Sequence, residues 1–450
     1  MRKKIKFINR IILISLAILI IASLVFLLFS TSLSFLFLSK TSAIGMPTNN
    51  KPMTSPSLPN YYAEATGKNV IVIQMEAFQN FPIQKSLMGH TLTPNLNNLI
   101  NDSIYFKNGI SQIASGNTSD AEFILNTSIY PPTSKAPFLN STDKPYIALP
   151  TILKKQGYYS ATFHTNTADF WNRKNMYPSL GFDTFYDKTF FGTDETIFYG
   201  ASDKILYEKT LEELKNYKKI GKNFYVNLVT ISSHAFFRNK EWMKPISFGG
   251  NYDKAIVGRY LAAVEYTDRQ LGSFLDKLKK SGLYDNSLIV IYGDHFGLTY
   301  NNMEAEYKNE NNYLIEKVLG RPYDNLDYIN IPIIFKLPSS ITKNRTFISE
   351  LPAGQMDIMP TILNLLGVKD TDGKFFGNDL LNIENNLLGL RFYMPTGSLI
   401  DSNGLYIAGS GLVTFDHKIL KGSKPSEDSN KKLKDLLYSS DLYLNNLPKK

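Results

Sequence analysis

Acidic and histidine side chains follow two short apolar runs in this sequence, and side chains of these types could bind a metal ion. Residues 70–75 form one run, which ends at Glu76, and residues 288–292 form another, which is followed by Asp294 and His295. Two carboxylates and one imidazole suit a divalent cation such as Mn²⁺, Mg²⁺ or Zn²⁺. Each residue alone could instead have a structural role, because an Asp can cap a helix and a His can pack in a core. Their placement after two strand-like runs favours a metal site.

Two more apolar runs end at histidines. Residues 158–163 are followed by His164, and residues 224–231 are followed by two serines and His234. Three of the five histidines in the chain therefore lie just beyond a predicted strand. In open α/β sheets, ligand sites assemble outside the carboxyl ends of the strands. We expect these histidines and the acidic residues above to share one edge of a sheet and to form an active site there.

A third group of polar residues opens a predicted helix at residues 117–122. One interpretation is structural, because Ser119 and Glu122 have the spacing of a capping box. The other is catalytic, because a hydroxyl at a helix amino terminus lies near N–H groups that favour a bound phosphate. Coordination to a cation could activate that hydroxyl as a nucleophile. The residue types do not decide between Thr118 and Ser119 as the nucleophile.

The loop that follows His164 contains Trp171 and Arg173. The guanidinium of Arg173 could bind a phosphate through two N–H groups, and Trp171 could form a wall against a sugar or glycerol. The alternative is a loop with an aromatic plug and a solvated arginine. Together with the hydroxyls above, these residues indicate chemistry at a phosphate group.

An edge of this kind requires a parallel sheet, and the sequence from Asn69 onward is typical of one. Short β-branched runs alternate with helical patterns, which predicts an α/β domain with a mostly parallel sheet over residues 69–367. Residues 301–327 are expected to form an insertion near the site, and residues 368–450 a small antiparallel sub-domain with a polar tail. Helices are expected at about 93–101, 119–127, 204–219, 254–280 and 360–366.

The net charge of +9 is concentrated at the amino terminus. Residues 1–10 contain five basic side chains and no acid, namely Arg2, Lys3, Lys4, Lys6 and Arg10. More than half of the net charge lies there, and the rest of the chain is close to neutral. The composition therefore argues against a broadly basic groove for nucleic acid.

A long apolar segment follows these charges. Residues 11–38 contain no ionisable side chain and are long enough to span a bilayer. The basic residues before the span predict a cytoplasmic segment at residues 1–10, and the Pro-containing residues 39–68 predict an extracellular linker. The chain contains no cysteine, which is compatible with export. We therefore predict a single-pass membrane protein whose catalytic domain is extracellular.

Six motifs occur in a recognisable order over residues 69–420, and together they carry a family resemblance. They are Asn69–Glu76, Thr93-Pro94-Asn95-Leu96, Gly116-Asn117-Thr118-Ser119-Asp120, Phe170-Trp171-Asn172-Arg173, Tyr292-Gly293-Asp294-His295 and Asp357-Ile358-Met359-Pro360-Thr361. The set resembles the extracellular domain of lipoteichoic acid synthases, within the sulfatase/alkaline-phosphatase-like superfamily. The resemblance implies an alkaline-phosphatase-like α/β fold.

The resemblance also implies roles for particular residues. It implies that Thr118 is the nucleophile rather than Ser119. It implies that one Mn²⁺ is bound by Glu76, Thr118, Asp294 and His295, and that the glycerophosphate group is bound by His164, Trp171, Arg173 and His234.

The reaction implied is the transfer of glycerol phosphate from phosphatidylglycerol to a polyglycerolphosphate or glycolipid acceptor. It would proceed through a glycerophospho-threonine intermediate and release diacylglycerol. The chain departs from the family at two points that bear on the acceptor and on polymerisation. It has Asn166 where the family usually has an aspartate, and one predicted membrane span where such synthases usually have five.

Three other functions fit parts of the sequence. A phosphodiesterase or phosphatase of the same superfamily could use Thr118 with water as the acceptor. A sulfatase is disfavoured, because the chain lacks cysteine and Thr118 lies in no Cys/Ser-x-Pro-x-Arg context. A non-catalytic binding domain is disfavoured, because all four expected metal ligands are present.

Overall fold

Residues 1–58 and residues 59–450 are separate units of the chain. The computed structural model describes residues 60–338, 347–369 and 371–449, all of them in the second unit. The expected cytoplasmic segment, the expected membrane span and most of the expected linker therefore lie outside the described residues. Within the described ranges, no helix is both long and apolar enough to cross a bilayer.

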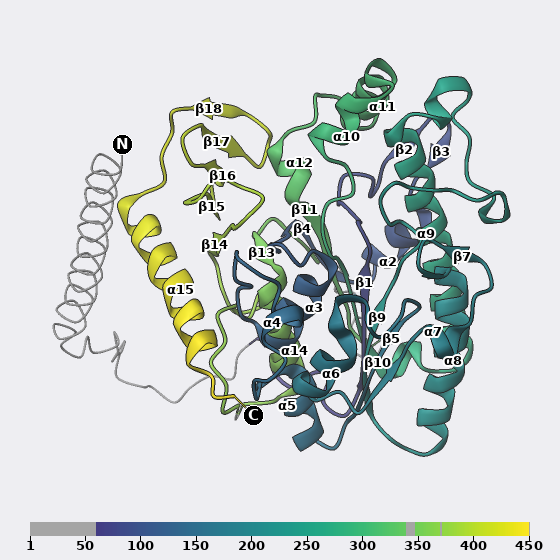
Figure 1. Cartoon of the computed structure of the whole chain (residues 1–450), viewed down its shortest axis with the longest axis vertical. Helices are drawn as coiled ribbons and strands as arrows, with labels where there is room; N and C mark the ends of the chain where they lie inside the picture. The colour runs from purple at the N-terminus through teal and green to yellow at the C-terminus, as the bar shows by residue number, and fades with distance from the viewer. Residues whose placement is uncertain (1–59, 339–346, 370, 450) are drawn as a thin grey trace, which may run out of the picture. The chain divides into compact units, whose positions relative to one another are not determined.

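A nine-stranded sheet forms the centre of the second unit (Figure 1). Its strands run in the order β12-β4-β11-β10-β1-β9-β5-β6, and β13 pairs with β4. In this sheet β11 runs antiparallel to both neighbours, whereas the other pairs are parallel. The mostly parallel sheet expected from the sequence is thereby confirmed. The strands are β1 (Asn69–Met75), β4 (Ile104–Ile110), β5 (Tyr159–His164), β6 (Thr184–Tyr186), β9 (Phe224–Val229), β10 (Ser287–Gly293), β11 (Asn330–Lys336), β12 (Phe347–Ser349) and β13 (Ala353–Gly354).

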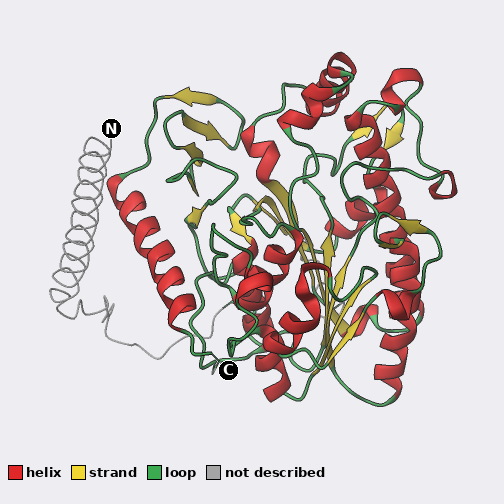
Figure 2. Ribbon diagram, in the orientation of Figure 1, coloured by secondary structure: helices red, strands yellow, loops and turns green. Residues whose placement is uncertain are grey.

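Helices cover both faces of this sheet, as Figure 2 shows. Because side chains alternate along a strand, Ile71 and Ile73 of β1 lie in one buried hydrophobic cluster, whereas Val70 and Val72 lie in another. The first cluster includes residues of α2 (Pro94–Ile100), α8 (Asp203–Lys219), α9 (Ile256–Lys280) and α11 (Lys308–Leu319). The second includes residues of α3 (Thr118–Thr127), α5 (Leu149–Lys155), α6 (Arg173–Leu180) and α14 (Ile358–Leu366).

The five helices expected from the sequence are present as α2, α3, α8, α9 and α14, with ends that differ by no more than two residues. The expected insertion at residues 301–327 is mostly helical. Short elements complete the domain: α4 (Pro137–Asn140), α7 (Lys188–Phe191), α10 (Tyr300–Ala305), α12 (Asn325–Ile329), and the strand pairs β2 (Ser86–Leu87) with β3 (His90–Thr91) and β7 (Thr196–Ile197) with β8 (Gly200–Ala201).

The carboxyl-terminal part contains the expected antiparallel sheet and an additional helix. The sheet order is β14 (Leu388–Gly389), β15 (Leu399–Asp401), β16 (Gly404–Ile407), β17 (Gly411–Thr414) and β18 (Ile419–Lys421). The segment expected as a polar tail instead forms the helix α15 (Glu427–Asn446). Two of its apolar residues, Leu433 and Leu444, are buried, and Ser440 accepts a hydrogen bond from the Tyr130 backbone N–H. A helix with few apolar residues is stable here because it packs against the domain.

The carboxyl ends of four central strands meet at one edge of the large sheet. Met75 of β1 lies beside Gly293 of β10, and His164 of β5 lies beside Val229 of β9. β9 in turn pairs with β1 in parallel. The residues that follow these strands therefore occupy the same edge, as the sequence predicts.

Candidate active site

A cavity of about 230 Å³ opens at this edge. It is lined by every site residue expected from the sequence except Asp294, which is fully buried next to the lining residue His295. The lining residues are Glu76, Asn117, Thr118, His164, Asn166, Phe170, Trp171, Arg173, Tyr199, Ile231, His234, Ala235, His295, Phe296, Gly297, Thr299 and Asn302. The structure therefore brings the expected residues together.

The expected metal ligands converge at the ends of β1 and β10. The Nε2 atom of His295 lies 3.5 Å from Glu76 Oε1 and 3.5 Å from Asp294 Oδ2. The Oγ1 atom of Thr118 lies 3.2 Å from Glu76 Oε2 and 3.4 Å from His295 Nε2. The ligand atoms of the two carboxylates and the imidazole all lie within 4.8 Å of one another. This spacing fits one cation bound between them.

Two oxygen atoms in this group are buried without a hydrogen-bond partner, Glu76 Oε1 and Asp294 Oδ2. The other oxygen of Asp294 accepts hydrogen bonds from the backbone N–H groups of Ala77 and His295, at 2.7 and 2.6 Å. Burial, with the nearby Asp294 charge, raises the pKa of Glu76 to about 8, and burial also raises the pKa of Asp294. Unpaired buried carboxylates are costly, and a bound cation would offset that cost. The residues present therefore fit a divalent metal.

The orientation of His295 also fits metal binding. Its Nδ1 atom lies 2.8 Å from the backbone carbonyl oxygen of Phe296, which can only accept a hydrogen bond. The Nδ1 atom therefore carries a proton, and Nε2 faces the carboxylates. Metal-binding histidines commonly have such a second hydrogen bond.

The two candidate hydroxyls at the start of α3 have different surroundings. Thr118 Oγ1 faces Glu76 and His295, whereas the Ser119 hydroxyl is fully buried and donates a hydrogen bond to the Gly116 carbonyl at 2.8 Å. Only Thr118 is therefore placed among the expected metal ligands. The alternative of a capping box is not realised, because Asn117 precedes the helix without a side-chain cap and Glu122 binds elsewhere.

Glu122 holds Arg173 in the wall of the cavity. Its Oε1 atom accepts hydrogen bonds from Arg173 Nε and Nη2 at 3.1 and 2.7 Å, and its Oε2 atom accepts one from Tyr177. Burial disfavours the charge of Arg173, but Glu122 keeps the pKa of Arg173 above its ordinary value. A third N–H group of Arg173 donates to the Phe170 carbonyl. Two of its five N–H groups therefore remain for a ligand. The alternative interpretation, a solvated arginine, is wrong because Arg173 is buried.

The remaining expected residues present polar and aromatic groups to the cavity. His164 Nδ1 lies 2.9 Å from the Val229 carbonyl, and burial together with the Arg173 charge holds the pKa of His164 well below its ordinary value. His164 is therefore neutral, with Nε2 available. His234 Nδ1 lies 2.6 Å from the Ala235 carbonyl, which similarly leaves its Nε2 available. Trp171 has a left-handed backbone conformation, with φ of 56°, where the chain turns into α6.

Sequence reasoning missed several residues that contribute to this site. The spacing of Ser119 and Glu122 indicates a cap, although a carboxylate one helical turn after Thr118 on an apolar helix is also a signal for a buried ion pair. Tyr177 and the lining residue Tyr199 had no comparable signal, because aromatic residues are common in cores. Asn302 lies in the segment that was expected near the site.

A second group of two carboxylates and a histidine lies between α12 and the β17–β18 turn. It consists of Asp324, Asp327 and His417. Here Arg321 donates hydrogen bonds to both Asp327 oxygens, at 2.6 and 2.8 Å, and its Nη2 atom lies 2.6 Å from His417 Nε2. His417 Nδ1 lies 2.8 Å from Asp324 Oδ2. The group therefore already contains its cation.

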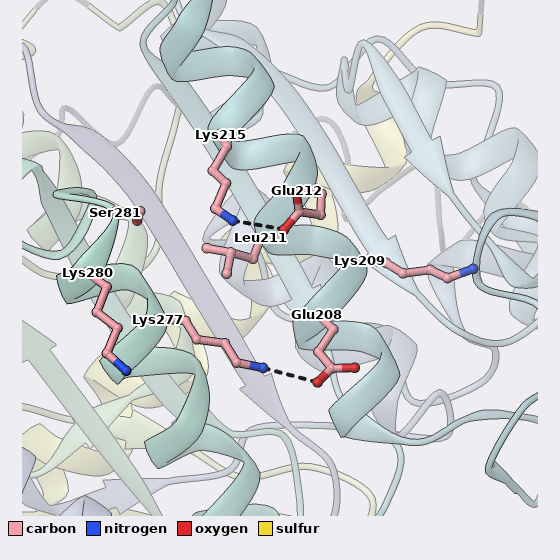
Figure 3. Close-up of a pocket in the computed structure, with 8 residues that line it drawn as sticks. All are labelled: Glu208, Lys209, Leu211, Glu212, Lys215, Lys277, Lys280 and Ser281. Carbon is pink, nitrogen blue, oxygen red and sulfur yellow. Dashed lines mark hydrogen bonds and ion pairs between the residues drawn. The ribbon is translucent and has the colours of Figure 1, made fainter.

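A larger cavity, of about 600 Å³, lies between α8 and α9 (Figure 3). Four of its charged side chains form ion pairs at the surface, Lys215 with Glu212 at 2.9 Å and Lys277 with Glu208 at 3.1 Å. All four side chains are substantially exposed. No histidine or buried acid lines this cavity, so the chemistry of the chain is better assigned to the smaller cavity at the sheet edge.

A sequence model of the sulfatase family matches residues 68–368. Lipoteichoic acid synthase 2 of Bacillus subtilis is 34% identical over 395 residues, which cover 86% of this chain and 58% of that protein. Lipoteichoic acid synthase of Staphylococcus aureus (strain USA300) is 34% identical over 399 residues, which cover 86% of this chain and 59% of that protein. The chain thus spans just under three fifths of the length of these curated relatives.

Solved structures support the fold. The lipoteichoic acid synthase LtaP from Listeria monocytogenes matches with a TM-score of 0.80 and 32% identity, over 89% of this chain and 97% of that one. A protein of the alkaline phosphatase superfamily from Vibrio parahaemolyticus matches with a TM-score of 0.66 and 22% identity, over 89% and 94% of the two chains. The alkaline-phosphatase-like fold expected from the sequence is confirmed.

Proposed function

The chain belongs to the sulfatase family and, within it, to the lipoteichoic acid synthase family, and on this premise we propose that it is a metal-dependent glycerophosphotransferase. The donor would be phosphatidylglycerol, and the acceptor a polyglycerolphosphate chain or a glycolipid. The observation that carries the proposal is the convergence of Thr118 Oγ1 with the ligand atoms of Glu76 and His295. A hydroxyl in such a group serves as a nucleophile rather than as a helix cap.

A divalent cation, for which we propose Mn²⁺, would be held by Glu76, Thr118, Asp294 and His295, and would supply positive charge that activates the hydroxyl and offsets phosphoryl charge. The two available N–H groups of Arg173 would bind a phosphoryl oxygen, because Glu122 fixes the guanidinium in the cavity wall. The available Nε2 atoms of His164 and His234 would bind further oxygens of the glycerophosphate group. Trp171 would lie against its glycerol carbons.

The proposed transfer has two displacement steps at phosphorus. Thr118 Oγ1 forms a bond to phosphorus, the bond to the diacylglycerol oxygen breaks, and diacylglycerol leaves with the hydroxyl proton. The acceptor hydroxyl then forms a bond to the same phosphorus, and Thr118 leaves and regains a proton. A water molecule in place of the acceptor would make the chain a phosphodiesterase.

We also propose that the domain is tethered outside the cell by a single membrane span at residues 11–38. The support for this is the 28-residue apolar segment and the five basic residues before it. A tether would hold the active site close to a lipid donor and so raise its effective concentration.

The test is lipid turnover by the purified full chain in vesicles that contain a fluorescent phosphatidylglycerol. We expect diacylglycerol release that requires Mn²⁺, and a glycerophosphate adduct on the Thr118 peptide in mass spectra. Thr118→Ala should abolish both, whereas the matched control Ser119→Ala should retain both, because the Ser119 hydroxyl faces away from the site. Release by Thr118→Ala at the parent rate would refute the proposal. Products analysed with and without an alcohol acceptor separate transfer from hydrolysis.

A further inference from the structure

The size of the catalytic cavity limits how much of a lipid it can hold. Its volume, about 230 Å³, is below the roughly 300–1,000 Å³ of pockets that enclose drug-sized ligands. A glycerol phosphate group fits in such a space, but two acyl chains do not. If the donor is a phospholipid, as proposed above, its acyl chains must remain outside the mouth of the cavity. The side chains around the mouth should then show what surrounds those chains.

Aromatic side chains lie along one side of the cavity mouth, near the ends of β5 and β9. Phe170 and Tyr199, which line the cavity, stack with ring centroids 5.4 Å apart. Phe198 contacts Tyr199 at 5.2 Å and the ring of His234 at 4.8 Å. Phe236 stacks against Phe198 at 6.4 Å and is 63% exposed. A large apolar ring thus stands in solvent beside the site.

A second aromatic group lies on the other side of β1, beyond the end of β10. The lining residue Phe296 stacks against Tyr328 at 4.4 Å and meets Tyr393 edge-on at 4.8 Å. Tyr393 in turn contacts Phe392, which is 53% exposed, and Tyr328 contacts the exposed Tyr300. Exposed aromatic residues therefore flank the mouth from both sides. We name them the aromatic rim: Phe170, Tyr199, Phe236, Tyr300 and Phe392.

The composition of the aromatic rim indicates its partner. Exposed apolar side chains that cluster around a site mark a binding surface, and aromatic residues are favoured at the headgroup level of bilayers. The guanidinium of the exposed Arg238 lies 5.1 Å from the Phe198 ring, and no acid pairs with it in the described part of the chain. An unpaired cation beside apolar rings matches a surface of anionic lipids.

We infer that the aromatic rim docks the domain onto an anionic lipid bilayer, with Phe236 and Phe392 at the boundary of headgroups and acyl chains. The lipid then presents its headgroup to the cavity while its acyl chains stay in the bilayer. The chain length permits this orientation. Residues 39–59 separate the expected membrane span from the described domain, and at roughly 3.3–3.6 Å per residue they reach as far as about 70 Å. The domain can therefore turn its mouth toward the membrane.

A position measurement tests the docking without any turnover. The chain has no cysteine, so single cysteines can be introduced and labelled with a fluorophore. The positions are Phe236→Cys and Phe392→Cys, with Ile220→Cys as the control, because Ile220 is 64% exposed and ends α8 at the opposite edge of the sheet. The full chain is placed in phosphatidylcholine vesicles with and without phosphatidylglycerol, with nitroxide-labelled lipids as quenchers.

We expect the labels at positions 236 and 392 to be quenched at least about twofold more than the label at position 220, and more strongly when phosphatidylglycerol is present. Equal quenching at the three positions would overturn the proposal. Stronger quenching at position 220 would also overturn it, because the domain would then lie with its other edge on the membrane. These outcomes do not depend on whether the chain has transferase activity.

A turnover comparison tests whether docking serves the reaction. The variant Phe236→Ser/Phe392→Ser is compared with the control Ile220→Ser on vesicle phosphatidylglycerol and on water-soluble dibutanoyl phosphatidylglycerol. We expect the aromatic-rim variant to lose about tenfold or more of its rate on vesicles and to keep its rate on the soluble substrate. An equal loss on both substrates, or on neither, would overturn the proposal. A parent chain inactive on both substrates would instead refute the proposed function.

Discussion

Two groups in this molecule have the same composition, two carboxylates and one histidine. They differ in whether an arginine of the chain is bonded to the carboxylates. In the group formed by Asp324, Asp327 and His417, the guanidinium of Arg321 supplies it and bonds to both Asp327 oxygens. In the group formed by Glu76, Asp294 and His295, two carboxylate oxygens are buried without a partner. Arg173, whose charge acts on Glu76, is itself bound to Glu122. Ligand types and spacing alone therefore do not distinguish the two groups, whereas the unpartnered buried carboxylate oxygens do.

The same difference gives the carboxyls opposite pKa directions. Burial and the Asp294 charge raise the pKa of Glu76 to about 8. Burial also works against the charge of Asp324, but hydrogen bonds from His417 and the Asp327 backbone, with the Arg321 charge, hold the pKa of Asp324 below its ordinary value. We name the first group the open cluster and the second the paired cluster. The predictions below test this distinction.

The largest effect is expected from the removal of one charge in the open cluster. Glu76→Gln should abolish stoichiometric metal binding and lower the transfer rate by more than about a hundredfold, because a ligand is lost where no other group can replace it. The measurements are elemental analysis of the purified full chain and the lipid-turnover assay. The matched control is Asp324→Asn in the paired cluster, which should keep both metal and activity. If Asp324→Asn lost metal to the same extent, the assignment of the two clusters would be wrong.

The next effect concerns the stability of the metal-free chain. Because the pKa of Glu76 is raised in the folded state, the folded chain binds more protons than the unfolded chain between about pH 4.5 and 8. The free energy of unfolding should therefore decrease as the pH rises through this window, by a few kcal/mol, and Glu76→Gln should reduce this slope. Urea denaturation in the presence of a chelator measures it. With Mn²⁺ added, the slope should flatten or reverse, because the metal binds the deprotonated ligand.

The difference between parent and variant is the quantity to compare in that experiment. Asp120, Asp268 and Asp357 are buried, and burial raises the pKa of each to about 6, so they contribute a slope of the same sign in both chains. Their contribution is common to both chains and cancels in the difference, so the difference that remains between pH 6 and 8 belongs to the open cluster. Parallel curves for parent and Glu76→Gln from pH 6 to 8 would contradict the pKa direction given for Glu76.

The residues of the candidate active site show which part of that site could be predicted from the sequence. Glu76, His164, His234 and Asp294 were predictable as one site because each lies at or shortly after the carboxyl end of a predicted strand, and parallel strands end at one edge. The choice of Thr118 over Ser119 required the structure or a family resemblance. Both residues carry a hydroxyl at the start of the same helix, and they differ only in the direction in which that hydroxyl points.

Contacts between distant segments could not be predicted in the same way. The role of Glu122 depends on Arg173, which is remote in sequence, and the paired cluster joins Arg321 to His417. A local pattern contains no signal for such pairs. The segment expected as a polar tail similarly folds as α15 because of packing partners such as Tyr130 that lie far away in the chain.

A third prediction concerns a variant in which the paired cluster, like the open cluster, has carboxylates without a bonded arginine. Arg321→Ala leaves two carboxylates without their cation and should cost about 2–3 kcal/mol of stability. In the Glu76→Gln background, which removes metal binding at the open cluster, the added Arg321→Ala change should create stabilisation by Zn²⁺. The measurement is thermal denaturation with and without Zn²⁺, and Glu76→Gln alone is the control. If Zn²⁺ stabilised neither chain, the guanidinium would not be what excludes a metal from the paired cluster.

The smallest effect is expected from Asp324→Asn. Asp324 Oδ1 accepts hydrogen bonds from the Leu326 and Asp327 backbone N–H groups at the start of α12, and an Asn can retain these. The variant loses only the charged interaction with His417 and Arg321, which should cost about 1 kcal/mol.

Because the pKa of Asp324 is lowered on folding, its contribution is complete above the unfolded-state pKa and is lost as the pH falls through the folded-state pKa. The difference in unfolding free energy between the parent and Asp324→Asn should therefore shrink as the pH falls from 5 toward 3, as measured by urea denaturation. A difference that grew toward low pH would mean that the carboxyl of Asp324 is destabilised by folding, as that of Glu76 is, and that the two clusters are not electrostatic opposites.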